Sequence, residues 1–184
     1  MPPDRAMTEM EALPPPVAGD ARSRRSARMV RRLTASLLVA AAVLFADQIT
    51  KGLAETLLPR HPDQSVMIAG DIMRFTYVAN RGAAFGILQD RTAFFVIVGV
   101  GVIAVILASY RYFPVTGSLL NLALGLQLGG AVGNLVDRVR YGYVVDFIDV
   151  SVWPVFNLAD SAIVIGVGIL AFRLLQREQA RISS

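Results

Sequence analysis

The chain has 184 residues, of which 54% are hydrophobic and only 17% charged, and its formal net charge is +4. This length suits one domain, and the apolar content points to a membrane protein. The absence of cysteine excludes disulfides, zinc thiolate sites and a thiol nucleophile. The basic excess is concentrated beside apolar segments, where lipid and membrane topology account for it, so we expect no nucleic-acid partner.

The N-terminal segment combines disorder-prone composition with positive charge. Residues 1–20 contain five prolines, four acids and few large apolar side chains, so they cannot bury enough surface to offset chain entropy. A stretch with six arginines follows before residue 33. We predict a disordered, basic cytoplasmic tail over residues 1–32, a four-helix domain over residues 33–176 and a cytoplasmic C-terminal tail over residues 177–184.

Four segments are long and apolar enough to cross a membrane as helices, since about 30 Å of hydrocarbon requires roughly 20 mostly apolar residues. Lys and Arg near span ends favour the cytoplasm, so we predict that both termini are cytoplasmic and that both long loops, residues 54–91 and 137–156, face outside. The expected fold class is therefore an all-α membrane protein with four transmembrane helices. The predicted spans are Leu33 to about Leu53, Thr92 to Tyr110, about Leu119 to Val136 and about Asn157 to Leu175.

The first span has an alternative interpretation as a cleaved secretory signal, because the arginines precede an apolar run that ends Leu44-Phe45-Ala46. However, Asp47 and Lys51 continue the helical pattern past that point, and three more spans follow. A retained helix is therefore favoured.

The loop between the first two spans predicts a small extracytoplasmic sheet, or cradle, over about residues 60–90. Val66-Met67-Ile68 and Phe75-Thr76-Tyr77-Val78 favour strands, and Gly70-Asp71 between them is a turn signal. Near Asn80, Gly82 and Gly86 permit backbone shapes that other residues resist. This segment is either a lid over a cleft or a plain surface sheet.

Glycines in the third span predict close helix packing. Gly125, Gly129 and Gly133 recur every four residues and so lie on one helix face. Such a face lets another helix approach closely.

Ionisable side chains at membrane depth are costly unless they are paired or functional. Asp47 and Lys51 are four residues apart on one helix face, which predicts an ion pair. Near the outer end of the third span, Asn134, Asp137 and Arg138 suit either a polar network or an anchor at the lipid headgroups. For all of these residues a structural role competes with a catalytic one.

Two further aspartates have a sharper interpretation. Asp146 lies in the apolar run Val144–Ile148, where a carboxylate needs a partner. Asp160 follows Asn157 by three residues, a spacing that also suits an ordinary capped helix start. If the two carboxylates meet, their repulsion lets the pair hold one proton near neutral pH. An aspartyl protease needs this state, because one carboxylate activates water while the other supports the carbonyl oxygen, without a metal.

Five sequence blocks between residues 47 and 161 resemble lipoprotein signal peptidase, also called signal peptidase II. Each block alone is a weak signal, but together and in this order they are specific. The blocks are Asp47-Gln48-Ile49-Thr50-Lys51, Asn80-Arg81-Gly82-Ala83-Ala84-Phe85-Gly86, Gly133-Asn134-Leu135-Val136-Asp137-Arg138, Val145-Asp146-Phe147 and Phe156-Asn157-Leu158-Ala159-Asp160-Ser161.

The resemblance implies an aspartic endopeptidase of the bacterial inner membrane, with Asp146 and Asp160 as catalytic residues at the extracytoplasmic face. Its substrate would be a prolipoprotein whose cysteine carries diacylglycerol, cut on the amino side of that cysteine. The cyclic peptide globomycin would inhibit it, membrane lipids would surround it, and a monomer would suffice. We expect no cofactor and no metal. The expected substrate-binding and supporting residues are Asp47, Lys51, Asn80, Gly82, Gly130, Asn134, Asp137, Arg138, Asn157 and Ala159.

Two other classes of function use the same residues. A small proton-coupled transporter would use the carboxylates as a relay, although no internal repeat is evident. A structural membrane protein would pair its aspartates with Lys51 and Arg138. The Gly-x-Gly-Asp element of presenilin-like and prepilin peptidases is absent from the sequence.

Overall fold

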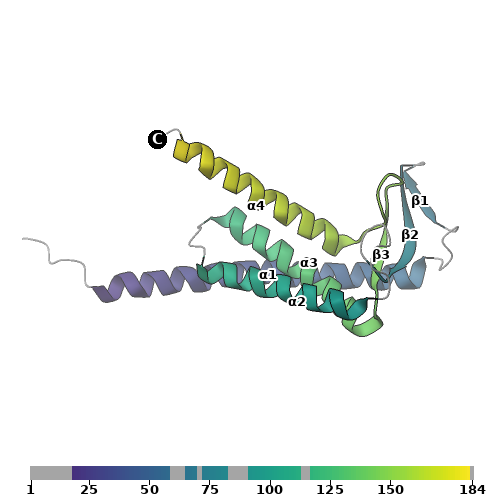
Figure 1. Ribbon diagram of the computed structural model, residues 1–184, viewed down its shortest axis with the longest axis horizontal. Coiled ribbons are helices and arrows are strands. Elements are labelled where there is room, and N and C mark those ends of the chain that lie inside the picture. The colour runs from purple at the N-terminus through teal and green to yellow at the C-terminus, as the bar shows by residue number, and fades with distance from the viewer. Residues whose placement is uncertain (1–17, 59–64, 70–71, 83–90, 113–116, 183–184) are drawn as a thin grey trace, which may run out of the picture. The chain divides into compact units, whose positions relative to one another are not determined.

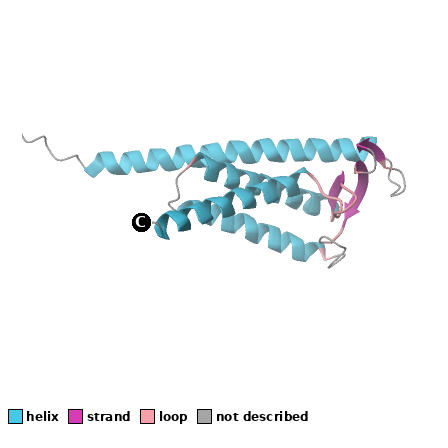
Figure 2. Ribbon diagram, turned by 90° about the horizontal axis from the view of Figure 1, so that it is seen from above, coloured by secondary structure: helices cyan, strands magenta, loops and turns pink. Residues whose placement is uncertain are grey.

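The computed structural model describes residues 18–58, 65–69, 72–82, 91–112 and 117–182. The chain divides into two compact units, residues 1–31 and 32–184, and the candidate site belongs to the second. In that unit the strands gather at one end of the helices (Figures 1 and 2). In chain order the elements are α1 (Ala18–Leu57), β1 (Val66–Ala69), β2 (Met73–Asn80), α2 (Thr92–Tyr112), α3 (Ser118–Tyr141), β3 (Val144–Asp149) and α4 (Leu158–Ile182).

All four helices are long and apolar enough to cross a membrane, which confirms the predicted fold class. The helix ends differ from the sequence prediction. Because α1 begins at Ala18 rather than Leu33, the prediction of disorder is wrong for residues 18–32. Ala and Arg favour helix, and extending an existing helix is far easier than nucleating one. At the other end α4 continues to Ile182. Residues 1–17 lie outside the described residues.

The strands form one antiparallel sheet in the order β1-β2-β3. Two of them lie between α1 and α2, as predicted, whereas β3 comes from the connection between α3 and α4 and was not predicted. In the central pairing Val78 lies opposite Asp146, and Asn80 lies opposite Val144. The predicted turn at Gly70-Asp71 and the predicted lid residue Gly86 are outside the described residues.

Close packing between α1 and α3 depends on glycine. A Cβ atom at Gly125 would lie 2.7 Å from the backbone oxygen of Ser36, and one at Gly129 would lie 2.6 Å from that of Ala40. Real Cβ atoms do not approach a carbonyl oxygen so closely, so larger residues would push α1 away. This confirms the packing role predicted from the four-residue glycine spacing.

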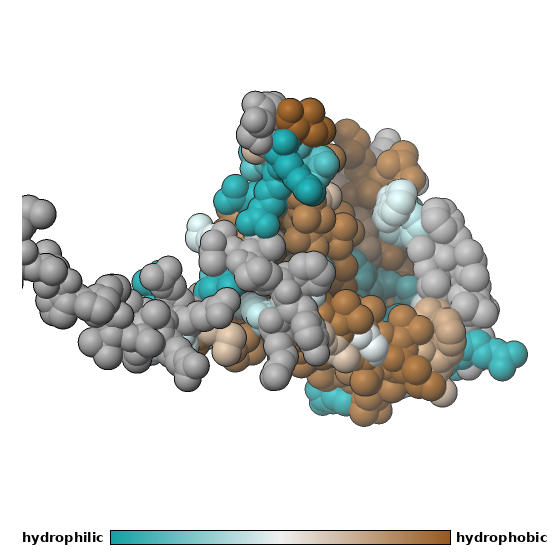
Figure 3. Space-filling view, turned by 60° about the vertical axis from the view of Figure 1, so that its left-hand side comes forward, coloured by the Kyte–Doolittle hydropathy of each residue, from teal (hydrophilic) through white to brown (hydrophobic). Residues whose placement is uncertain are grey.

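The outer surfaces of the helices are apolar. Ile97 and Val105 of α2 are 72% and 67% exposed, and Val164 of α4 is 69% exposed. Figure 3 shows apolar residues, in brown, over much of the face that it presents. A helix on the surface of a water-soluble bundle would expose polar side chains there, so these faces suit contact with lipid.

Candidate active site

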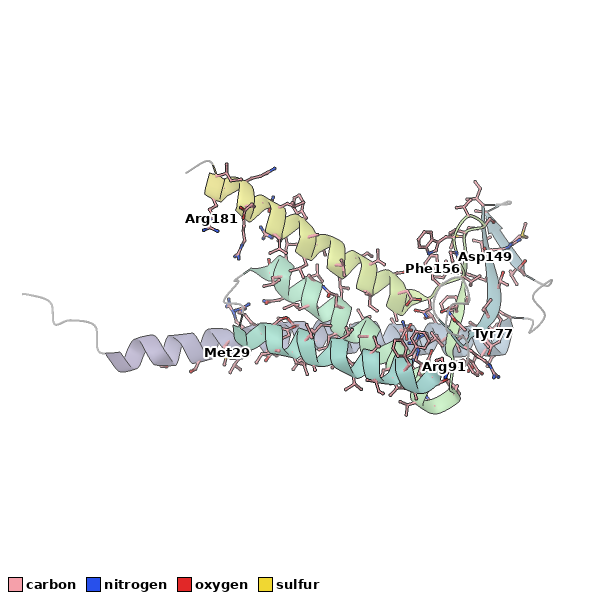
Figure 4. All side chains as sticks on the ribbon, viewed as in Figure 1. Met29, Tyr77, Arg91, Asp149, Phe156 and Arg181 are labelled. Carbon is pink, nitrogen blue, oxygen red and sulfur yellow. The ribbon has the colours of Figure 1, made fainter. Side chains whose placement is uncertain are left out.

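The candidate catalytic residues meet where the sheet joins the helices. Asp146 of β3 and Asp160 in the first turn of α4 line one cavity of about 180 Å³. Phe156, beside this cavity, lies at the sheet end of the helices, and Arg181 lies at the far end of α4 (Figure 4). The other described residues that line the cavity are Asn80, Gly82, Asn134, Arg138, Val144, Trp153, Pro154, Val155 and Phe156.

Asp146 is almost fully buried, and two asparagine amides hold it. Its Oδ2 accepts a hydrogen bond from Asn80 Nδ2 at 2.8 Å, and its Oδ1 accepts one from Asn157 Nδ2 at 2.7 Å. The sheet register explains the first bond, because Asn80 is two residues beyond Val78, the partner of Asp146, and shares its face. The backbone N–H of Gly82 donates to Asn80 Oδ1 at 3.0 Å, which turns the amide nitrogen toward Asp146.

The surroundings of Asp146 favour its protonated form. Burial raises the pKa of Asp146 to about 7, and the charge of Asp160 adds to this effect, although the hydrogen bonds from Asn80 and Asn157 oppose it. A carboxyl group with this pKa gains and loses a proton near neutral pH. The partners that donate side-chain hydrogen bonds to Asp146 in the described part of the chain are thus the amides of Asn80 and Asn157.

Asp160 combines a structural and a site role. Asn157 Oδ1 accepts a hydrogen bond from the Asp160 backbone N–H at 2.9 Å, and Asp160 Oδ2 accepts one from the Asn157 backbone N–H at 3.3 Å. This reciprocal arrangement is a capping box at the start of α4. The remaining oxygen, Oδ1, accepts a hydrogen bond from Asn134 Nδ2 at 2.7 Å. The capping interpretation is therefore confirmed, and one carboxylate oxygen still faces the site.

Lys51 is the centre of a second, buried network. Its Nζ lies 2.9 Å from Asp47 Oδ2 and 2.8 Å from Asp137 Oδ2, and it donates to Asn134 Oδ1 at 2.9 Å. The predicted Asp47–Lys51 ion pair is confirmed, and Asp137 is an additional partner. Because Asn134 Oδ1 faces the ammonium group, its Nδ2 is left to face Asp160.

The two carboxylates paired with Lys51 also hold the segments that carry the cavity aspartates. Asp47 Oδ1 accepts a hydrogen bond from the Ala159 backbone N–H at 3.0 Å, and Asp137 Oδ2 accepts one from the Val145 backbone N–H at 3.2 Å. Gly130 faces the Ala159 carbonyl oxygen so closely that a Cβ atom would overlap it. Ala159 and Gly130 therefore let α4 approach α3 next to the site.

Arg138 lies beside the two candidate catalytic aspartates. It lines the cavity, and its Nη1 donates to the Asn134 backbone oxygen at 3.4 Å. Its guanidinium carbon lies 5.0 Å from the centre of the Phe95 ring, a cation–π contact that holds the side chain against α2. The predicted polar network around the end of the third span is thus present.

The sequence did not single out Gln48. Its Nε2 donates to Asp137 Oδ1 at 3.0 Å, to Asp47 Oδ2 at 3.3 Å and to the Gly133 backbone oxygen at 3.4 Å. The sequence feature that could have identified Gln48 is its polar amide, which lies in an apolar span directly after Asp47. Gln48 joins α1 to α3 beside the Lys51 ion pairs.

Comparison with known proteins decides the family. A family model for signal peptidase (SPase) II matches residues 39–176. The chain belongs to the signal peptidase II family. Similar proteins include lipoprotein signal peptidases of three bacteria. That of Moorella thermoacetica is 53% identical over 139 residues, or 76% of this chain and 91% of the relative. That of Halothermothrix orenii is 45% identical over 143 residues, or 77% of this chain and 96% of the relative. That of Geobacter sulfurreducens is 41% identical over 145 residues, or 75% of this chain and 89% of the relative.

Solved structures agree with this family assignment. Two structures of a bacterial membrane enzyme obtained by the in meso method, at 2.3 Å and 1.9 Å resolution, match with TM-scores of 0.71 and 0.69 and 33% identity. The matches cover 77% and 76% of this chain and 87% and 92% of those chains. This member of the signal peptidase II family is thus a peptidase and a multi-pass bacterial membrane protein.

Proposed function

We propose that the protein is an aspartic endopeptidase that removes signal peptides from diacylglyceryl-modified prolipoproteins, cutting on the amino side of the modified cysteine. The observation that carries this proposal is the shared cavity of Asp146 and Asp160, in which burial and charge raise the pKa of Asp146 to about 7. Membership of the signal peptidase II family supports the substrate class.

The catalytic pair shares one proton near neutral pH. The ionised carboxylate takes a proton from water as the water oxygen bonds to the scissile carbonyl carbon, while the protonated carboxyl group gives its proton to the carbonyl oxygen. In the second step one hydroxyl of the intermediate returns its proton to the carboxylate that supplied it. The C–N bond breaks, and the other carboxyl group protonates the leaving amine, which restores the pair.

The remaining site residues fall into two roles in this proposal. Asn80, Gly82 and Arg138 line the cavity and contact the substrate, and Asn80 also holds Asp146. The others position the pair from the side of the helices through the hydrogen bonds and close contacts described above. These supporting residues are Asp47, Lys51, Gly130, Asn134, Asp137, Asn157 and Ala159.

The proposed topology places the sheet end outside the cytoplasm of the bacterial inner membrane and both termini inside it. The arginine-rich segment before residue 33 supports this orientation. Two acyl chains anchor the substrate in the bilayer and bring its cleavage site to the membrane surface, where the cavity would then lie. Residues 33–176 form the protease domain, residues 1–32 and 177–184 are cytoplasmic tails, and a monomer is sufficient.

The deciding experiment is cleavage of a diacylglyceryl-modified prolipoprotein by the purified protein in detergent, followed by gel shift. Wild type is compared with Asp146→Asn and Asp160→Asn at matched folded concentration, and globomycin is added to a parallel wild-type reaction. We expect cleavage by wild type, inhibition by globomycin and no cleavage by either folded variant. Cleavage by both variants would refute the aspartate pair, and an inactive wild type would refute the function.

A further inference from the structure

One wall of the cavity is a loop. Residues 150–156, here called the 150–156 loop, lie between β3 and Asn157, the residue before α4. The last four of them, from Trp153 to Phe156, line the cavity together with Asp146 and Asp160. The position of this loop therefore determines the space beside the catalytic pair.

A third aspartate holds the beginning of the loop. Asp149 is the last residue of β3 and is only 6% exposed. Its Oδ2 accepts hydrogen bonds from Arg74 Nε at 2.6 Å and from Thr76 Oγ1 at 3.2 Å, both on β2. Its Oδ1 accepts a hydrogen bond from the Ser151 backbone N–H at 2.9 Å. One carboxylate thus joins the central strand to the first turn of the loop.

The other end of the loop is held by backbone hydrogen bonds. The Phe156 carbonyl oxygen accepts from the N–H groups of Phe147 at 3.0 Å and Ile148 at 2.8 Å, and the Phe156 N–H donates to the Ile148 oxygen at 3.0 Å. Between these two anchors Val152 is 91% exposed. The exposed tip lies between these anchors, which therefore fix both ends of the wall.

The first anchor also stabilises an unfavourable backbone conformation. Ser151 has a φ of 62°, in the left-handed region that non-glycine residues adopt only when their surroundings hold them there. Burial opposes ionisation of Asp149, but hydrogen bonds from Arg74, the Ser151 N–H and Thr76 keep its pKa below the usual range. The carboxylate therefore stays ionised at neutral pH and can accept all three hydrogen bonds at once.

We propose that Asp149 is a positioning residue that holds the 150–156 loop as a wall of the catalytic cavity and thereby sets which side chain fits next to the scissile bond. The proposal rests on the proposed function. Asp149 acts through the loop, and the polar groups that hold Asp146 and Asp160 are different ones. Loosening the loop should weaken substrate binding and relax side-chain selectivity while the chemical step continues.

Asp149→Asn tests this with almost no change of shape. An asparagine must direct its NH₂ group either at the Ser151 N–H or at the donors on β2, so one side of the connection is lost. Kinetics are measured on two lipid-modified substrates that differ only in the residue before the modified cysteine, glycine or valine. We expect KM for the glycine substrate to rise about tenfold with kcat changed less than about twofold, and the ratio of kcat/KM between the two substrates to move about fivefold toward one.

Two further variants make the test specific. Glu178→Gln, on the exposed C-terminal part of α4, makes the same carboxyl-to-amide change away from the loop and should leave KM and selectivity unchanged. Arg74→Gln weakens the connection from its exposed side, since Arg74 is 41% exposed, and should raise KM about threefold. Arg74→Gln carries the test if Asp149→Asn does not fold.

Folded Asp149→Asn or Arg74→Gln protein with wild-type KM and selectivity would overturn the proposal, as would a loss confined to kcat. Wild-type protein that cleaves neither substrate would instead refute the proposed function. The melting temperature of each variant in detergent shows whether the fold is intact.

Discussion

Two pairs of aspartates lie at the sheet end of the helices, and they differ in their partners. Asp47 and Asp137 lie 2.9 and 2.8 Å from Lys51 Nζ, a cation that both carboxylates share and that offsets part of their charge. Among the described residues, neutral asparagine amides donate the side-chain hydrogen bonds to Asp146 and Asp160, and both aspartates line the cavity. An amide carries no charge, so it does not neutralise a carboxylate. Burial disfavours the ionised carboxylate, and binding a proton removes its charge. In the proposed mechanism, the partner rather than the residue type separates aspartates that hold the structure from aspartates that transfer protons.

The largest expected effect separates the two roles of Asp160. Asp160→Asn should lower kcat/KM by at least about a thousandfold, because an amide cannot exchange the required proton. Its oxygen can still accept from the Asn157 N–H, so the start of α4 should remain intact. Asp160→Ala should lose the same activity and also about 1 kcal/mol of stability with the cap. Cleavage rates and melting temperatures of both variants check this, and an active Asp160→Asn enzyme would contradict it.

Removing Lys51, the partner of Asp47 and Asp137, should mainly lower the stability of the fold. Lys51→Met removes the cation between Asp47 and Asp137 and leaves two buried carboxylates without it. Removing one partner of a buried ion pair costs about 3–5 kcal/mol, so we expect a much lower melting temperature in detergent.

The control for this prediction removes the carboxylate charges as well. A triple variant with Lys51→Met, Asp47→Asn and Asp137→Asn should recover most of the stability, because no buried charge is left unbalanced. If Lys51→Met melts like wild type, the buried ion pairs do not stabilise the fold.

A smaller effect is expected at Gln48, which supports the Lys51 pairs. Gln48→Leu removes a hydrogen bond to Asp137 and another to Asp47, and should cost about 1–3 kcal/mol of stability with catalysis largely retained. Thr56→Val, which removes an exposed hydroxyl bonded within its own helix, is the matched control and should change stability less. Equal melting temperatures for the two variants would show that the hydrogen bonds of Gln48 do not stabilise the fold more than the Thr56 hydroxyl does.

The pH dependence should follow the pair in the cavity. Above about pH 7 Asp146 loses its proton, so kcat/KM should fall about tenfold per pH unit on the alkaline side. Its pKa in the folded protein is higher than the value of about 3.9 in an unfolded chain. Its contribution to stability is therefore complete below that value and declines as the pH rises through about 7.

Melting temperatures between pH 5 and 9 test the stability part of this prediction. Wild type should lose stability as the pH rises to about 7 and change little above it, and Asp146→Asn should lose less. The same pH dependence in both proteins would assign the change to another group.

Local patterns in the sequence were sufficient for some contacts. The Asp47–Lys51 ion pair follows from a spacing of four residues in a helix, and the glycine stripe of α3 follows from the same periodicity. In contrast, β3 was missed, because a short apolar run around Asp146 does not distinguish a strand from a buried helix segment by periodicity. Its strand character depends on pairing with β2.

The sequence by itself determined the four apolar spans and the supply of polar groups near their ends, because hydrophobic length and helical spacing are local properties. Only the tertiary structure decided which partner each polar group has. Asn80 reaches Asp146 across 66 residues of chain, and Lys51 reaches Asn134 across 83. These long-range contacts depend on strand register and on close helix packing. Both bring together side chains that are too far apart in the sequence for any local spacing to predict their contact.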